Sequence, residues 1–166
     1  FIGTGIMGLP MAQNLQKAGH DIFLSTHHDA APAALLEAGA VALANPKEVA
    51  QEAEFIIEMV PDTPHVEDVL LRENGIAEGV GPNKLVIDMS SISPSATKAF
   101  AEKINATGAQ YLDAPVSGGE VGAKAATLSI MVGGSEESFA RALPLFQLMG
   151  KNITLVGGNG DGQTAK

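Results

Sequence analysis

The sequence contains no cysteine, few aromatic residues and few basic residues, and each shortage excludes a class of protein. Without cysteine, disulfide bridges and thiolate metal sites are impossible. Aromatic residues make up only 4%, so small and aliphatic side chains must build the core. The 10 Lys and Arg residues form no cluster and are outnumbered by 19 Asp and Glu residues, which argues against a nucleic-acid partner. The acidic balance leads us to expect a soluble cytoplasmic protein. No apolar run approaches the roughly 20 residues of a membrane helix, so we expect no membrane partner.

The residues that are abundant indicate an ordered domain. Hydrophobic residues make up 45% of the 166 residues and charged residues 17%, which suits one domain, residues 1–166, with a sizeable core. The chain opens inside an apolar segment at Phe1 without an initiator Met and stops at Lys166 without a terminating signal. We therefore expect a fragment of a longer polypeptide, in which residues 157–166 lead into further sequence.

Short apolar runs alternate with segments of helical periodicity. The runs predict strands at Phe1-Ile2, Ile22–Leu24, Phe55–Ile57, Leu85–Ile87, Tyr111-Leu112, Leu128–Val132 and Ile153–Val156. The segments between them predict helices at Met7–Ala18, Ala33–Ala38, Lys47–Glu52, Pro64–Leu71, Ser95–Ala106 and Glu136–Met149. Strands without polar alternation are buried on both faces, and intervening helices act as crossovers. The pattern predicts an α/β fold of the Rossmann type, a doubly wound and mostly parallel sheet with helices on both faces.

Four residues predict helix ends within this pattern. Gly19 and Gly39 follow helical segments, as C-terminal capping glycines do. Ser93 and Ser135 precede helical segments and are expected to cap their N-termini.

The strongest motif is a glycine-rich turn between the first apolar run and the first helix. It is Gly3-Thr4-Gly5-Ile6-Met7-Gly8, with the spacing G-x-G-x-x-G. Gly3 permits the tight turn, Gly5 lets a pyrophosphate approach the backbone, and Gly8 lets the helix pack on the strand. A pyrophosphate is then stabilised by the free N–H groups of the helix N-terminus. The alternative is a turn without a ligand, but the strand–turn–helix context favours a dinucleotide site.

The end of the second strand should distinguish NAD from NADP, because a carboxylate there binds the ribose diol of NAD. The segment that follows this strand instead carries hydroxyl and imidazole side chains, including Thr26 and His27. No Arg follows to hold a 2′-phosphate, so His27 and His28 either hold it weakly or are solvated loop residues. We expect NAD or NADP as cofactor and leave the preference open.

Further motifs extend the evidence beyond the glycine turn. They are Met59-Val60-Pro61-Asp62, Asp88-Met89-Ser90-Ser91, Asp113-Ala114-Pro115-Val116-Ser117-Gly118-Gly119 and Gly160-Asp161-Gly162-Gln163-Thr164-Ala165-Lys166. Together with the turn, they resemble the β-hydroxyacid dehydrogenases, the family of 3-hydroxyisobutyrate dehydrogenase, and most of all the members that reduce tartronate semialdehyde. The resemblance covers the whole chain.

This resemblance assigns cofactor contacts to residues that follow predicted strands. It implies that Val60, Pro61 and His65 lie beside the cofactor and that Ser91 contacts its nicotinamide end. Ligands of doubly wound sheets bind outside the carboxyl ends of the strands, which agrees with these positions. The alternatives are an exposed helix-start residue for His65 and simple capping for Ser90 and Ser91.

The substrate contacts implied by the resemblance lie in the loop Ser117, Gly118 and Gly119. One hydroxyl and consecutive unhindered N–H groups suit an anionic carboxylate, although a tight turn without ligand has the same composition. The resemblance also makes Lys166 the catalytic lysine, near which Ser117 would act. A lysine can stabilise the nascent alkoxide and deliver its proton.

The implied activity is NAD(P)H-dependent reduction of tartronate semialdehyde to glycerate. Alternatives are oxidation of 3-hydroxyisobutyrate or another short β-hydroxyacid, or a dinucleotide-binding module without catalysis. The family's helical C-terminal domain and an asparagine beyond Lys166 lie outside the chain, and that domain would form a homo-oligomer. Asp88 and Asp113 are interpreted as structural, and the histidines are not spaced as metal ligands.

Overall fold

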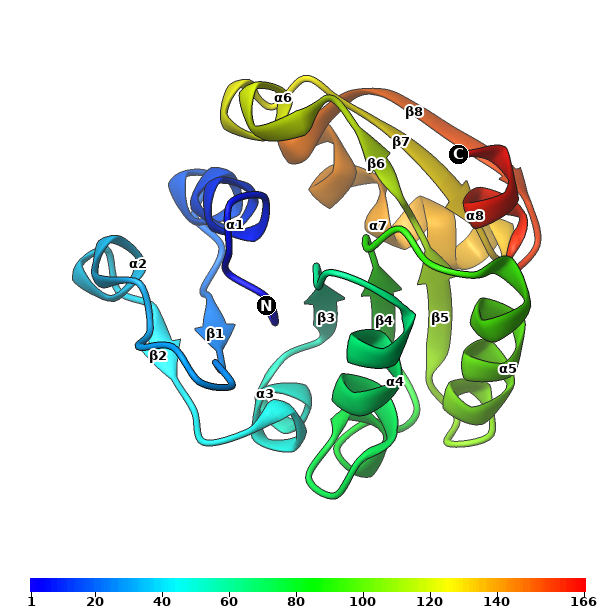
Figure 1. Ribbon diagram of the computed structural model, residues 1–166, viewed down its shortest axis with the longest axis horizontal. Coiled ribbons are helices and arrows are strands. Elements are labelled where there is room, and N and C mark those ends of the chain that lie inside the picture. The colour runs from blue at the N-terminus through cyan, green and yellow to red at the C-terminus, as the bar shows by residue number, and fades with distance from the viewer.

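The computed structural model describes residues 1–166 as an α/β domain built on a mostly parallel sheet (Figure 1). Its central strands β3 (Phe55–Glu58), β4 (Leu85–Asp88) and β5 (Gln110–Asp113) are parallel and paired residue for residue. Beyond β5 lies β7 (Leu128–Gly133), which is antiparallel to β5 and parallel to the edge strand β8 (Gly150–Gly157). The short β6 (Val116–Ser117) pairs antiparallel with β7.

A parallel pair, β1 (Phe23–Leu24) and β2 (Val41–Ala42), continues the arrangement on the other side of β3. Ile2 joins the two parts, because it forms parallel bridges with both Ser25 and Glu58. Its N–H donates to the Ile57 carbonyl at 2.8 Å, and its carbonyl accepts from the Met59 N–H at 2.8 Å. The apolar segment before the glycine turn therefore lies at the centre of the parallel arrangement.

The helices connect the strands and pack against the sheet. They are α1 (Gly8–Lys17), α2 (Ala33–Glu37), α3 (Pro46–Glu52), α4 (Thr63–Leu71), α5 (Pro94–Asn105), α6 (Gly119–Ala125), α7 (Glu136–Met149) and α8 (Asp161–Ala165), with a 3₁₀ turn at Ile76–Glu78. None of the helices combines the length and the apolar character that a membrane span requires.

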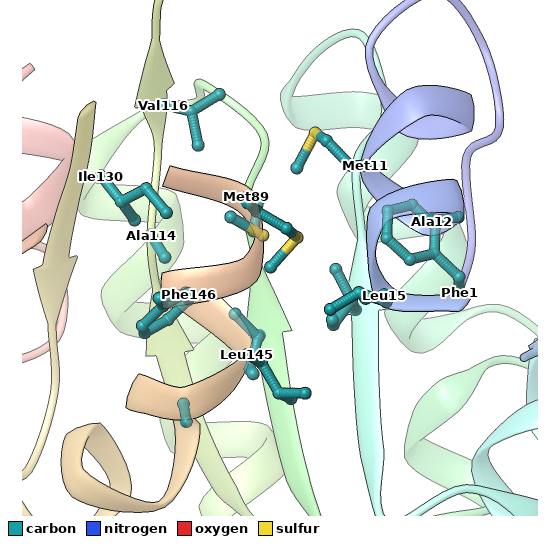
Figure 2. Close-up of a cluster of buried hydrophobic side chains, with 14 of the residues drawn as sticks. Phe1, Met11, Ala12, Leu15, Met89, Ala114, Val116, Ile130, Leu145 and Phe146 are labelled. Carbon is teal, nitrogen blue, oxygen red and sulfur yellow. The ribbon is translucent and has the colours of Figure 1, made fainter. Parts of the chain in front are cut away.

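Two hydrophobic clusters flank the sheet, one on each face. The first has 23 buried residues, including Met11 and Leu15 of α1 and Leu145 and Phe146 of α7. Figure 2 shows these side chains around Met89, which follows β4. The second has 14 buried residues, drawn from α3, α4, α5 and the other face of the central strands. This two-sided burial confirms the predicted doubly wound class.

The predicted helix ends are confirmed. Ser93 Oγ accepts from the Ala96 N–H at 3.3 Å, and Ser135 Oγ accepts from the Ser138 N–H at 3.1 Å. Gly19 and Gly39 have φ of +98° and +106° directly after α1 and α2, a backbone conformation that glycine adopts without a steric penalty.

The predicted elements differ from the structure in four places. Only Ile2 of the predicted strand Phe1-Ile2 forms bridges, so no extended strand forms there, and β2, β6 and α6 were not predicted. β2 and β6 have only two residues each, and their pairing partners β1 and β7 lie elsewhere in the chain. Such strands carry almost no periodic signal of their own.

Candidate functional site

The glycine turn has the geometry that its spacing predicts. Gly3 has φ +95°, and a Cβ there would lie 2.0 Å from the Met59 carbonyl oxygen; a Cβ on Gly8 would lie 1.7 Å from the Gly3 carbonyl oxygen. Around Gly5, by contrast, nothing lies within 4 Å of an added Cβ. The two outer glycines therefore permit close packing, and the middle one leaves backbone open to a ligand.

The N-terminus of α1 offers unpaired N–H groups at this opening. No side chain caps the helix, and the N–H groups of Ile6, Met7 and Gly8 donate to no group of the chain. The Ile6 side chain is 72% exposed. Unpaired donors together with the positive end of a helix dipole form an anion site, and the open backbone at Gly5 fits a pyrophosphate.

The loop after β1 brings together residues that are distant in sequence. Thr26 Oγ1 donates to the Asp29 carbonyl at 2.5 Å, and the rings of His27 and His28 lie 3.9 Å apart. Arg72, at the C-terminal end of α4, places Nη1 3.1 Å from His27 Nδ1. An arginine therefore contacts this loop, although none follows β1 in the sequence: Arg72 lies 45 residues from His27, and the crossover topology brings it near.

The segment after β3 is fixed by side chains on either side. The Val60 N–H donates to Ser90 Oγ at 2.9 Å. Asp62 caps α4 by accepting from the His65 N–H at 3.2 Å, and its carboxylate also contacts His65 Nδ1. The hydrogen bond from the His65 side chain lowers the pKa of Asp62. His65 thus lies at an exposed helix start, while Val60 and Pro61 lie beside the end of β4.

Lys166 and Ser91 are brought together directly. Lys166 Nζ donates to Ser91 Oγ at 2.7 Å, although 75 residues separate them. Lys166 follows α8, and Ser91 follows β4, so the contact lies at the carboxyl ends of the parallel strands (Figure 1). This contact joins two of the residues that the sequence motifs singled out.

Gln163 fixes this contact and was missed in the sequence. Its Nε2 donates to the Ser90 carbonyl at 2.7 Å, and its Oε1 accepts from the Ile92 N–H at 3.0 Å. The side chain therefore bonds to the backbone on both sides of Ser91. The only sequence indication was a polar residue one helical turn before Lys166, which does not distinguish a buried residue from an exposed one.

Asp113 anchors the start of α8 from the other side. Its two carboxylate oxygens accept from the Gly160 N–H at 2.9 Å and the Gln163 N–H at 3.1 Å. Burial raises the pKa of Asp113, and these N–H donors oppose the rise. The carboxylate thus contacts backbone that leads to Lys166, in agreement with a structural role.

Three carboxyl groups lie in register across the ends of β3, β4 and β5. They are Glu58, Asp88 and Asp113, all fully buried. Asp88 accepts from the Ser90 N–H at 2.9 Å and from the Tyr111 hydroxyl at 3.3 Å, and burial raises its pKa to about 7. Glu58 has no hydrogen-bond partner; burial, and after it the nearby Asp88, raises its pKa well above the usual value.

The loop after β6 presents the second open backbone segment. Gly118 and Gly119 have φ of +138° and +61°, and nothing lies within 4 Å of a Cβ added to Gly119. Ser117 is exposed at the end of β6. The helix α6 that follows lies beside α1, joined by a 2.8 Å hydrogen bond from Asn14 Nδ2 to the Ala123 carbonyl. No hydrogen bond joins Ser117 to Lys166, whose side chain bonds to Ser91 instead, so the structure does not bring these two predicted residues together.

A glycine turn opening an uncapped helix, in a sheet wound on both faces, defines a Rossmann-type dinucleotide-binding domain. The family model of the NAD-binding domain of 6-phosphogluconate dehydrogenase matches residues 1–158. The chain therefore belongs to this family of NAD-binding domains, and within it to the β-hydroxyacid dehydrogenases.

Individual relatives support this placement. The chain is 57% identical to 2-hydroxy-3-oxopropionate reductase of Escherichia coli K12 and 44% identical to 3-hydroxyisobutyrate dehydrogenase of Pseudomonas aeruginosa PAO1; each match covers all of this chain and 56% of the relative. The solved structure of Mycobacterium tuberculosis 3-hydroxyisobutyrate dehydrogenase with L-serine superposes with a TM-score of 0.92 at 35% identity, covering 99% of this chain and 56% of that one. The chain thus spans little more than half the length of these relatives.

Proposed function

We propose that this chain is the cofactor-binding domain of an enzyme that reduces tartronate semialdehyde to D-glycerate with NADH or NADPH. The observation that carries the proposal is the contact of Lys166 Nζ with Ser91 Oγ at 2.7 Å, at the carboxyl ends of the parallel strands. In such sheets, ligands bind in the crevice outside these ends.

The glycine turn and the neighbouring strand ends would hold the cofactor. The turn residues Gly3, Thr4, Gly5, Ile6, Met7 and Gly8 supply open backbone for the pyrophosphate. Thr26 and His27 lie toward the adenosine, and Val60, Pro61, His65 and Ser91 lie along the path to the nicotinamide. When bound, the nicotinamide supplies the hydride that reduces the carbonyl carbon.

The chain's own residues would hold the substrate and supply its proton. Ser117, Gly118 and Gly119 offer a hydroxyl and open backbone to the carboxylate of a short semialdehyde. Lys166 would donate a proton to the carbonyl oxygen as negative charge develops there, and it would accept the proton in the reverse reaction. Ser91 orients the Lys166 ammonium group through their hydrogen bond.

The whole enzyme is proposed to need sequence beyond this chain. The relatives extend well past the matched region, since the chain covers only 56% of their length. We infer that this additional part closes the site over the substrate and forms a homo-oligomer.

Turnover by the full-length protein tests the proposal. NAD(P)H oxidation would be measured with tartronate semialdehyde and, as the matched alternative, methylmalonate semialdehyde. We expect a higher kcat/KM with tartronate semialdehyde. A preference for methylmalonate semialdehyde would contradict the proposed substrate and favour a 3-hydroxyisobutyrate dehydrogenase. If the protein binds the dinucleotide but turns over no short β-hydroxyacid or semialdehyde, it is a dinucleotide-binding module without catalysis.

A further inference from the structure

Arg72 reaches from the end of α4 to the loop that follows β1. Its Nη1 lies 3.1 Å from His27 Nδ1 and also 3.1 Å from Asp68 Oδ2, one helical turn earlier in the chain. The Arg72 side chain keeps 29% of its surface exposed. A guanidinium group with five N–H donors therefore lies half-buried against the loop with several donors left over.

The contact with Arg72 also orients the imidazole of His27. Arginine is always protonated and can only donate, so His27 Nδ1 must be the acceptor. The proton of the neutral ring is then on Nε2, and His27 becomes a second donor. The backbone N–H groups of His27 and His28 have no partner within the chain and add further donors to the same loop.

No carboxylate occupies the position that would bind a ribose diol. Ser25 and Thr26 end the strand, and the Thr26 hydroxyl is engaged with the Asp29 carbonyl. Asp68 is paired with Arg72, the residue that contacts the loop. Asp29 is the remaining acid, and its exposed carboxylate has no partner. Hydrogen-bond donors therefore outnumber acceptors at the position where a Rossmann fold contacts the adenosine ribose.

We propose that Arg72 and His27 bind the 2′-phosphate of NADP(H), so that the enzyme prefers NADP(H) to NAD(H). The proposal rests on the proposed function, because it requires the dinucleotide to lie across the strand ends. A guanidinium group matches phosphate geometry with two parallel hydrogen bonds. The arginine comes from the helix after β3 rather than from the loop after β1 itself.

Calorimetric titration of the full-length protein with NADP+ and NAD+, without substrate, tests this site. Wild type should bind NADP+ at least about 10-fold more tightly than NAD+. Arg72→Gln should weaken NADP+ binding by about 10-fold or more and leave NAD+ binding unchanged. Arg72→Lys keeps the positive charge but loses the planar pair of N–H donors. Its affinity for NADP+ should therefore lie between those of wild type and Arg72→Gln. Asp68→Asn, which frees the guanidinium group and removes a negative charge, should tighten NADP+ binding.

Arg141→Gln is the matched control. Arg141 is also a partly exposed arginine in an ion pair, but it belongs to α7, and its partner Glu54 directly precedes β3, at the opposite end of that strand from the cofactor site. Arg141→Gln should change the affinity for neither NADP+ nor NAD+. Equal affinity of wild type for NAD+ and NADP+, or equal loss of both in Arg72→Gln, would overturn the proposal while leaving the proposed function intact. Failure of both dinucleotides to bind would overturn the proposed function, and the 2′-phosphate site with it.

Discussion

The two ends of the proposed cleft are built differently. At the Lys166 end, buried Gln163, Asp113 and Asp88 bond to backbone groups and fix the segments that carry Ser91 and Lys166. At the adenosine end, Thr26, His27 and Arg72 make exposed contacts in a short loop. We infer that the proposed chemistry depends on buried, paired groups that hold Ser91 and Lys166 in place. The proposed cofactor preference depends instead on surface side chains that can change at little cost in stability.

Removing the lysine is the largest expected perturbation of the Lys166 end. Lys166→Ala in the full-length protein should lower kcat by about 100-fold or more, because the proton donor is lost. Dinucleotide affinity should change little, since the proposed pyrophosphate site lies at the N-terminus of α1. Steady-state kinetics and calorimetry measure the two quantities, and Lys151→Ala, an exposed lysine on β8, is the control. Equal losses of kcat and of dinucleotide affinity would contradict the assigned role.

Gln163→Leu tests whether this end depends on buried pairing. The substitution leaves the Ser90 carbonyl and the Ile92 N–H without partners, which should lower the free energy of unfolding by about 1–3 kcal/mol. kcat should fall more than KM changes, because Lys166 loses its fixed position. Gln147→Leu, an exposed glutamine on α7 without side-chain bonds, is the matched control. If denaturant unfolding gives the same loss for both variants, the Gln163 contacts do not hold this end together.

The contrast between local and long-range contacts also explains what the sequence could predict. The glycine turn and the Ser93 and Ser135 caps were predictable, because the partners of each lie within a few residues along the chain. The contacts of Gln163 with Ser90 and of Arg72 with His27 join residues 73 and 45 positions apart. No local propensity encodes such pairs, so they emerge only when the crossovers bring the strand ends together.

The contact between Ser91 and Lys166 was predictable only in part. Family motifs identified both residues, but only the fold shows that Nζ and Oγ bond to each other. Likewise, Glu58 ends an apolar run and gave no sign in the sequence that its carboxyl group would be buried without a partner.

The pH dependence of stability at Glu58 tests, with a smaller expected effect, how the buried groups near the Lys166 end behave. Its folded pKa is raised, so its contribution to stability is complete below its usual value of 4.5 and is lost as pH rises toward the folded pKa. Asp88, raised from 3.8 to about 7, acts in the same direction. These two groups should therefore make the free energy of unfolding fall as pH rises from about 4 toward 7, at up to about 1.4 kcal/mol per pH unit for each group that ionises.

Glu58→Gln cannot ionise, so its unfolding free energy should fall less steeply over this pH range. Thermal or denaturant unfolding at several pH values measures the slope, with Glu52→Gln, an exposed glutamate on α3, as the control. Parallel profiles for wild type and Glu58→Gln would mean that burial does not raise the pKa of Glu58 in the folded protein.

The most direct measurement is calorimetric titration of Gly5→Ala with NAD+ and NADP+, beside wild type and Gly81→Ala. A methyl group at Gly5 meets nothing within 4 Å in the chain, and one at Gly81 meets only the Thr107 carbonyl oxygen at 3.9 Å, so both variants should fold and melt like wild type. We predict that wild type and Gly81→Ala bind a dinucleotide and that Gly5→Ala loses most of that affinity. Unchanged binding by Gly5→Ala, or no binding by wild type, would contradict a pyrophosphate site at the glycine turn.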